Sequence, residues 1–236
     1  MIRSKSQSSE FIQYLITTSQ EGQTERLPSL TEISQILGVS VARLREQLEV
    51  ARALGMVEVR PRTGIRRLPY SFLPAVRQSL SYCLELDRAC FDHYSDLRTH
   101  IEAAYWREAV CKLTVEDHAA LRMLIAAAWE KLRGAPVQIP HAEHRELHLA
   151  VFRRLGNPFV LGILEAYWEA YEHFGLNLYT DYHYLEQVWN YHQKMVDAIC
   201  QGNFDEGYQA LVEHTDLIRY RHPISRSTDK EMLPSG

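Results

Sequence analysis

The chain has 236 residues, of which 46% are hydrophobic, and this content suffices for one sizeable core and a second, smaller one. Its apolar runs are short, as from Met123 to Trp129, whereas a membrane-spanning helix needs about 20 apolar residues. The amino-terminal residues also lack the apolar stretch of a secretion signal. The sequence therefore predicts a soluble, cytoplasmic protein of two domains that makes no contact with a membrane.

Charge is distributed unevenly along the chain, although the formal net charge is only −4. Residues 1–70 carry ten Lys and Arg against seven Asp and Glu, and the remainder carries sixteen against twenty-three. A basic amino-terminal part suits contact with a polyanion, whereas an acidic remainder does not. This asymmetry favours nucleic acid as a partner of the first part.

Three short helices are predicted within the first 55 residues. The first covers 10–20, the second begins after Ser29 and stops at Gly38, and the third has Ser40 as its N-cap. Their apolar positions recur at helical spacing, namely Phe11, Ile12, Leu15 and Ile16, then Ile33, Ile36 and Leu37, then Leu44, Leu48 and Ala51. The result is a helix, a glycine-containing turn and a further helix.

The stretch 54–69 alternates apolar and polar residues about a turn at Arg62-Thr63-Gly64, which predicts a two-stranded hairpin rich in arginine. A helix-turn-helix followed by such a hairpin is typical of a winged helix. The third helix then enters the major groove and the arginines contact phosphates. A generic small domain whose arginines form only a solvated surface is the alternative that this pattern leaves open.

Beyond Pro69 and Pro74 the pattern changes to long helical periodicity. Helical faces recur at 116–132, 143–154, 158–175, 183–200 and 205–219. The predicted fold is mainly α, and we divide the chain into a winged helix-turn-helix domain at 1–70, a linker at 71–78, an all-helical antiparallel bundle at 79–222 and a disordered tail at 223–236. The four cysteines form no closely spaced pair, so we expect buried free thiols at Cys83, Cys90, Cys111 and Cys200.

Four of the eleven histidines lie where helices have an inward face. His144 and His148 are four residues apart, hence one turn apart on one face, where both imidazoles reach one metal ion. His192 and His214 each lie beside the apolar stripe of a helix. A histidine in such a place also suits a hydrogen-bonded core, so spacing alone leaves both roles open.

The stretch LPSLTEISQILGVSVARLREQLEVARALGMVEVRPRTG resembles the DNA-binding domain of the GntR family of bacterial regulators. It departs from the family at Thr31, where an arginine is common, and at Val41-Ala42, where Arg-Thr is common. The resemblance implies a homodimer on palindromic double-stranded operator DNA. Arginine reads guanine with two hydrogen bonds, so Arg43 and Arg45 are the expected readers of bases. The full set of expected DNA contacts is Ser40, Arg43, Arg45, Arg60, Arg62, Thr63, Gly64 and Arg66.

Two further stretches, HRELHLAVFRRLGNPFV and NYHQKMVDAICQGNFDEGYQALVEH, resemble the FCD effector domain of FadR-like GntR regulators. The resemblance implies a divalent metal ion held by His148, His192 and His214, with His144 at a position where the family usually has an aspartate. An imidazole in place of a carboxylate makes the site less anionic, so zinc or nickel is expected rather than magnesium. His144 either ligates the ion or fills space while water or an effector carboxylate completes the shell.

Arg98 and Glu102 match an arginine and a glutamate on the first long helix of that domain. We expect Arg98, together with Asn157, to bind a small organic acid as effector, since guanidinium recognises carboxylate. The alternative is a surface ion pair between Arg98 and Glu102, which are four residues apart. Nearby aromatic residues are expected either to line the effector pocket or to be plain core, namely Tyr167, Trp168, Tyr171, Tyr179 and Trp189.

The prediction is therefore a ligand-responsive transcriptional regulator without enzymatic activity. Two alternatives remain at this level. One is a histidine-metal hydrolase in which Glu143, Glu146 or Glu213 serves as the base. The other is a DNA-binding protein whose metal is purely structural.

Overall fold

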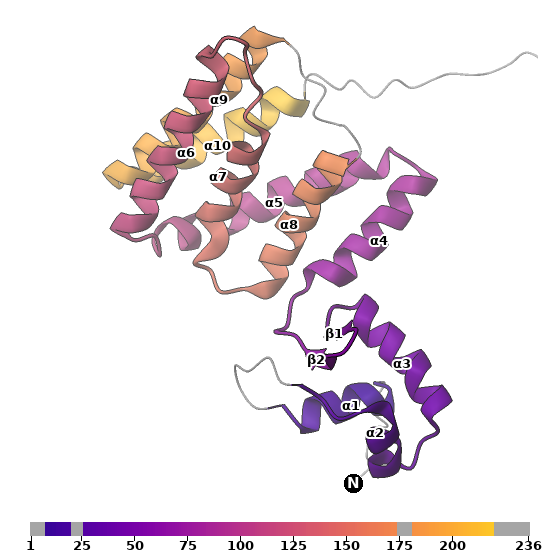
Figure 1. The fold of residues 1–236 in the computed structure, drawn as a ribbon. Coiled ribbons are helices and arrows are strands. Elements are labelled where there is room, and N and C mark those ends of the chain that lie inside the picture. Colours follow the sequence, from indigo (N-terminus) through magenta and orange to yellow (C-terminus); the bar gives the residue numbers. More distant parts are fainter. Residues whose placement is uncertain (1–7, 20–25, 174–180, 220–236) are drawn as a thin grey trace, which may run out of the picture. The chain divides into compact units, whose positions relative to one another are not determined.

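The computed structural model describes residues 8–19, 26–173 and 181–219, and in these ranges the chain forms ten helices and one two-stranded sheet (Figure 1). This confirms the mainly α fold predicted from the sequence. The elements are α1 (Glu10–Thr17), α2 (Leu30–Leu37), α3 (Val41–Ala53), β1 (Val57–Arg60), β2 (Gly64–Arg67), α4 (Leu73–Leu86), α5 (Cys90–Val110), α6 (Val115–Arg133), α7 (His141–Arg153), α8 (Pro158–His173), α9 (Tyr182–Gln201) and α10 (Phe204–Arg219).

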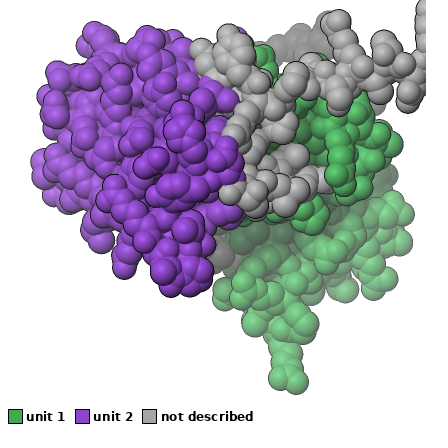
Figure 2. Space-filling model, turned by 90° about the horizontal axis from the view of Figure 1, so that it is seen from above, with its two compact units in different colours: residues 1–98, 156–176 green, residues 99–155, 177–236 purple. Residues whose placement is uncertain are grey.

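The chain divides into two compact units, coloured separately in Figure 2. Unit 1 comprises residues 1–98 and 156–176, and unit 2 comprises residues 99–155 and 177–236. Unit 1 therefore holds the amino-terminal helices and hairpin together with α4 and α8, whereas unit 2 holds α6, α7, α9 and α10. The predicted domain division stays a prediction, and its tail at 223–236 lies outside the described residues.

The first three helices begin at side-chain caps, of which those at Ser29 and Ser40 were predicted from the sequence and that at Ser9 was not. Ser9, Ser29 and Ser40 each accept a hydrogen bond from a backbone N–H of the first turn of α1, α2 and α3, and Ser29 forms a reciprocal capping box with Glu32. Gly38 ends α2 with a φ of 66°, a left-handed conformation that favours glycine. The shared core of these helices and the hairpin contains Phe11, Leu15, Leu27, Ile33, Leu44, Leu48, Ala51, Val57 and Ile65.

Two residues predicted on the apolar faces of these helices are on the surface instead. Ile16 is 59% exposed and Ile36 is 62% exposed. Both helices have only eight residues, and a single side of each contributes buried side chains. Ile33 alone is buried in α2, so the inward face is narrower than the spacing of apolar residues suggests.

The predicted hairpin is present as an antiparallel pair. Val57 lies opposite Arg67 and Arg60 lies opposite Gly64, so residues 61–63 form the connecting turn. Arg62 in this turn has a φ of 67°, which is uncommon for a residue other than glycine. The turn therefore holds an arginine at its tip in a strained backbone conformation.

Helices α4 and α8 form a second core within unit 1. Leu80 and Leu84 of α4 pack with Ala166 and Ala170 of α8. Gly162 permits the close approach, because a Cβ there would lie 2.7 Å from the backbone nitrogen of Leu73. Most of the stretch 71–78, predicted as a linker, is the start of α4, where Pro74 is accommodated in the first turn.

The expectation of four buried free thiols is wrong. Cys83 near the end of α4 is disulfide-bonded to Cys90 at the start of α5, with their Cα atoms 6.3 Å apart. The chain reverses direction between these helices, which brings two residues seven positions apart into contact. Cys111 is free but exposed, and Cys200 is free and half-buried.

Unit 2 is a helical bundle whose elements match the predicted helical faces. Thr114 and Asp117 form a capping box at the start of α6, and Gly202 ends α9 in a left-handed conformation. Its buried apolar side chains include Leu121, Ile125, Leu132, Leu147, Phe152, Val188, Met195, Val196, Ile199, Ala210 and Leu211. Among the described residues, no helix has the length and apolarity required to cross a membrane.

Candidate functional site

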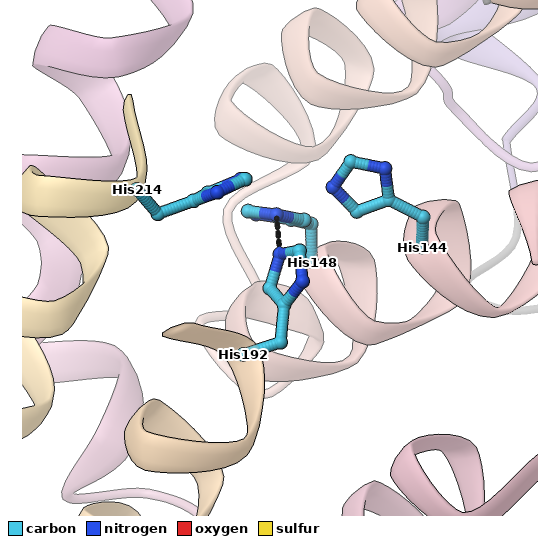
Figure 3. Close-up of side chains that lie close together, drawn as sticks. All are labelled: His144, His148, His192 and His214. Carbon is cyan, nitrogen blue, oxygen red and sulfur yellow. Dashed lines mark hydrogen bonds between the residues drawn. The ribbon is translucent and has the colours of Figure 1, made fainter. Parts of the chain in front are cut away.

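Four histidines from three helices of unit 2 converge on one point (Figure 3). His144 and His148 come from α7, His192 from α9 and His214 from α10. Each offers one ring nitrogen, and these nitrogens all lie within 4.8 Å of one another. His148, His192 and His214 are buried, and His144 is half-buried. The structure thus brings together the four residues that the sequence predicts as metal ligands.

The helices place these rings by the same faces that build the core. His148 lies four residues before the buried Phe152 in α7, and His192 lies three residues before the buried Met195 in α9. His214 lies three residues after the buried Leu211 in α10. Because residues three and four apart share a helical face, packing these apolar faces together also points the imidazoles inward.

The spacing of the rings suits a metal ion. The Nε2 atoms of His148 and His192 are 3.1 Å apart. With metal–nitrogen distances of about 2.0–2.1 Å, neighbouring nitrogens of a tetrahedral site lie about 3.3 Å apart. The ring centres of His192 and His214 are 4.3 Å apart, and those of His144 and His192 are 4.7 Å apart. The cluster can therefore hold a metal ion after small ring movements.

A buried carboxylate supports the cluster from α5. The Nδ1 atom of His148 lies 3.1 Å from Oε1 of Glu102, and both side chains are almost completely buried. When Glu102 is ionised it only accepts hydrogen bonds, and the tautomer of His148 that fits this contact donates from Nδ1 and leaves the Nε2 lone pair facing the other histidines. A carboxylate in this position fixes the tautomer and orientation of a ligating histidine.

From the sequence, Glu102 was considered only as an ion-pair partner of Arg98, and its contact with His148 was not predicted. The two residues are 46 positions apart, and no spacing rule joins α5 to α7. The one available signal was that Glu102 lies four residues before Trp106, which puts both on one face of the helix. A glutamate needs a hydrogen-bonding partner when it is buried.

The environment of Arg98 excludes the surface ion pair that the sequence left open. Arg98 is 1% exposed and Glu102 is fully buried. Within unit 1, the guanidinium of Arg98 lies 4.5 Å from the ring centre of Tyr167 and 5.1 Å from that of Trp168. A cation over aromatic faces is stabilised by the ring quadrupoles. Trp168 and Trp189 are themselves buried, whereas Tyr179 lies outside the described residues.

Asn157, the second residue predicted to bind an effector, caps a helix. Its Oδ1 accepts hydrogen bonds from the backbone nitrogens of Phe159, at 3.1 Å, and Val160, at 3.3 Å. This is the ordinary role of an asparagine before a helix that begins with proline. Its role toward an effector stays a prediction.

The predicted DNA contacts lie on two elements of the winged helix in unit 1. Ser40 caps α3, Arg43 and Arg45 are exposed on its first turns, and Arg43 is ion-paired with Glu10. The hairpin carries the remaining contacts: Arg60, which pairs with Glu58, then Arg62 and Thr63 in the exposed turn, and Gly64 and the half-buried Arg66 in β2. Arg67, the fourth hairpin arginine, is buried and donates to Oγ1 of Thr18.

The glutamates considered as bases for hydrolysis are held in ion pairs. Glu143 lies 2.6 Å from Nζ of Lys131, and Glu146 lies 2.8 Å from Arg153. Glu213 lies 3.9 Å from Nζ of Lys194 and accepts a hydrogen bond from Gln209. Each of these three carboxylates thus has a polar partner other than the histidine cluster.

Comparison with known proteins gives a consistent assignment. The model of the FCD domain matches residues 94–217 of the chain, a range that contains all four histidines. An uncharacterized HTH-type transcriptional regulator of Escherichia coli K12, YieP, is 27% identical over 191 residues, which cover 78% of this chain and 80% of that protein. The solved structure of a Streptococcus agalactiae GntR protein covers 89% of this chain and 96% of its own, with a TM-score of 0.64 and 18% identity. This last likeness establishes the fold.

Proposed function

Because the chain belongs to the FCD family of GntR-type transcriptional regulators, we propose that it binds operator DNA as a homodimer and responds to a small organic acid. The observation that carries this proposal is the presence, in one chain, of a winged helix and a buried four-histidine cluster. An exposed basic element suits a polyanion, and a buried cluster of nitrogen ligands suits an ion. The proposed domains are 1–70 for DNA and 79–222 for metal and effector, joined at 71–78.

On the DNA side, the proposal assigns base reading to the first turns of α3 and phosphate contact to the hairpin. Ser40 caps α3, so Arg43 and Arg45 both lie on the first turns of the helix, next to its backbone N-terminus. Arg43 and Arg45 would then contact base edges. Arg60, Arg62, Thr63, Gly64 and Arg66 would contact the backbone, which positions the protein without reading the sequence.

A homodimer follows from the same geometry of recognition. One recognition helix covers only a few base pairs, whereas two helices about 34 Å apart occupy successive major grooves of a palindrome. Doubling the contacts raises both affinity and site length. We therefore propose that the DNA-binding form is a symmetric pair of chains.

On the metal side, His144, His148, His192 and His214 would hold a divalent ion, with zinc or nickel as the expected metal. Four imidazoles carry no charge, and nitrogen ligands suit these ions better than magnesium or calcium. When bound, such an ion acts as a Lewis acid toward an anionic ligand. The residues of the chain supply the rest: Glu102 orients His148, and buried apolar neighbours exclude water from the rings.

For the effector, we propose that Arg98 binds the carboxylate of the acid, with Asn157 as a second contact. Arg98 is buried against two aromatic rings, so its donors act in a medium of low polarity where a charge-assisted hydrogen bond is strong. Effector affinity and operator affinity would then be coupled to the same extent in both directions.

A structural role for the metal is the second candidate, and one observation favours it. If all four histidines ligate a tetrahedral ion, the shell is complete and no position remains for an acid on the metal. In that case the ion stabilises the bundle. Any organic acid that binds the chain then does so away from the metal. Hydrolysis has less support, because it needs an open coordination position and a free base.

Fluorescence anisotropy on DNA from upstream of the chain's own gene tests the proposal. We expect salt-sensitive binding that is changed by a chelator or by one member of a panel of small organic acids. Absence of binding at low salt would overturn the regulator proposal. Binding that no acid changes, together with loss of folded structure on metal removal, would favour the structural metal.

A further inference from the structure

We propose that Glu10 is a positioning residue for base recognition. It holds the guanidinium of Arg43 in the orientation for reading a base and keeps it from moving to a phosphate. The inference rests on the proposed DNA-binding function and on a contact that the sequence did not reveal. Glu10 is the first residue of α1, 33 positions before Arg43 in α3.

The contact belongs to a chain of hydrogen bonds. Nη2 of Arg43 donates to Oε1 of Glu10 at 2.6 Å, and Nε2 of Gln47 donates to Oε2 of the same carboxylate at 2.6 Å. Oε1 of Gln47 in turn accepts from the backbone nitrogen of Phe11 at 2.8 Å. Arg43 and Gln47 are four residues apart, so both project from one face of α3 onto the start of α1.

This arrangement fixes the carboxylate on two sides. Gln47 is half-buried and Phe11 is completely buried, so the far end of the chain of hydrogen bonds is anchored in the core of the winged helix. The pKa of Glu10 is lowered by a backbone hydrogen bond at the start of its own helix, by Gln47 and by the charge of Arg43. Glu10 is therefore an ionised acceptor at neutral pH, held in place independently of Arg43.

The ion pair between Arg43 and Glu10 is too exposed to contribute much to the stability of the fold. The side chains of Arg43 and Glu10 are 60% and 40% exposed, and exposed ion pairs contribute little to stability. Its consequence is geometric instead. Arginine has five N–H donors in a planar fork, and a single contact at Nη2 restrains the plane while leaving donors free for a guanine.

The same contact lowers the attraction of α3 for arbitrary DNA. Arg43 paired with Glu10 is neutral overall, whereas a free Arg43 can neutralise a phosphate and release a counterion. Glu10 thus favours a base contact, which requires a defined orientation, over a phosphate contact, which does not. This is a contribution to specificity rather than to affinity.

The test uses the full chain and a duplex selected by the wild-type protein from a random library. Arg43→Ala should relax the preference at one base pair, which identifies the base that Arg43 reads. Glu10→Gln should relax the preference at the same base pair by at least fivefold, the lower end of what one bidentate contact provides. On random duplex its salt dependence should steepen by about 0.9, the slope of one added phosphate contact.

The chain offers a matched control in Glu49→Gln. Glu49 also pairs with an arginine of α3, Arg52, at 2.8 Å, and its loss changes the net charge of the chain equally. It should leave the preference at that base pair unchanged. In the Arg43→Ala background, Glu10→Gln should add no further relaxation. In the chain that keeps Arg43, Glu10→Asp should retain part of the preference that Glu10→Gln loses.

The outcomes separate the inference from the proposed function. If the wild-type chain selects no sequence, the proposed function fails and the inference with it. If a sequence is selected but Glu10→Gln behaves as Glu49→Gln does, or Arg43→Ala relaxes no base pair, the inference alone is overturned. Circular dichroism of each variant checks that the winged helix is folded.

Discussion

The histidine cluster lies in the interior of unit 2 on three helices, whereas the predicted DNA contacts lie on the surface of the winged helix in unit 1. Each histidine is positioned by the core packing of its helix. Two of the arginines predicted to contact DNA are held by exposed ion pairs, Arg43 with Glu10 and Arg60 with Glu58. The positions of the histidine rings are thus determined by the packing of the helices. The positions of the paired arginines depend on single side-chain partners, each of which one substitution can remove.

This difference predicts that substitutions in the two sites have unequal effects. When a buried histidine ligand is removed, the close packing of the interior prevents a neighbouring side chain from taking its place at the metal. Removing an exposed cation leaves a surface on which other cations remain. The predictions below test this contrast from the largest expected effect to the smallest.

The largest effect is expected for His192→Ala. His192 is completely buried and lies 3.1 Å from His148, so its loss removes a central ligand. Zinc or nickel affinity, measured by calorimetric titration, should fall more than about 100-fold, beyond what loss of an outer-shell partner causes. His183→Ala on the same helix is the control, because His183 has a side chain that is 76% exposed. Equal metal affinities of the two variants would contradict the site.

A smaller loss is expected for Glu102→Gln. The amide keeps the shape of the side chain but is a weaker acceptor for Nδ1 of His148. Metal affinity should fall about 10- to 100-fold while the helical content stays constant. Glu108→Gln, also on α5 and paired with Lys112 on the surface, should change nothing. A Glu102 variant with unaltered metal affinity would show that the carboxylate does not support the cluster.

On the DNA side, Arg62→Asn should have a moderate effect. Asparagine tolerates the left-handed conformation of this position, so the change removes the charge without disturbing the turn. The slope of log affinity against log salt should decrease by about 0.9, as for loss of one phosphate contact. Arg88→Asn, outside the winged helix, should leave the slope unchanged, and a similar shift in both variants would point to general electrostatics.

The smallest effect is expected for Asp117→Asn in the capping box of α6. Two hydrogen bonds from Arg154 and one from the backbone of Thr114 lower the pKa of Asp117 from 3.8 to about 2. A lowered pKa means that the stabilisation is present above pH 4 and is lost as the pH falls toward 2.

Urea unfolding at pH 7 should therefore show a loss of about 0.5–1 kcal/mol for Asp117→Asn, the range of a helix cap. The difference from wild type should shrink toward pH 3. Asp205→Asn, whose side chain is 99% exposed, is the control and should show no such pH dependence. A difference that is undiminished at pH 2 would mean that the charge of Asp117 is not its cause.

Much of this architecture could be predicted from the sequence. Caps such as Ser29 and Ser40 and the alternation in 54–69 mark local structure directly, so the helices and hairpin were predicted. The i, i+4 spacing of His144 and His148 and the resemblance to the FCD domain indicated the cluster. The caps, the alternation and the histidine spacing are features of short stretches of sequence, and the remaining indication came from the resemblance to the FCD domain.

The contacts that the sequence did not reveal all join two different helices. Glu102 meets His148, Glu10 meets Arg43, and Cys83 meets Cys90 across a chain reversal. Ile36 was predicted on the buried face of its helix but is exposed, because the spacing of apolar residues defines a face and does not say how much of that face other elements cover. Such contacts depend on how the helices pack against one another, and the hydrophobic periodicity of a single sequence does not determine that packing.

Calorimetric titration of zinc or nickel into the chelator-stripped chain, free and bound to its selected duplex, tests the central claim most directly. If the metal centre is coupled to DNA binding, the metal affinity must differ between the two forms by the same factor by which the metal changes operator affinity. The account predicts a difference of at least about fivefold, the lower end of typical coupling. Equal metal affinities in the free and bound forms would contradict it.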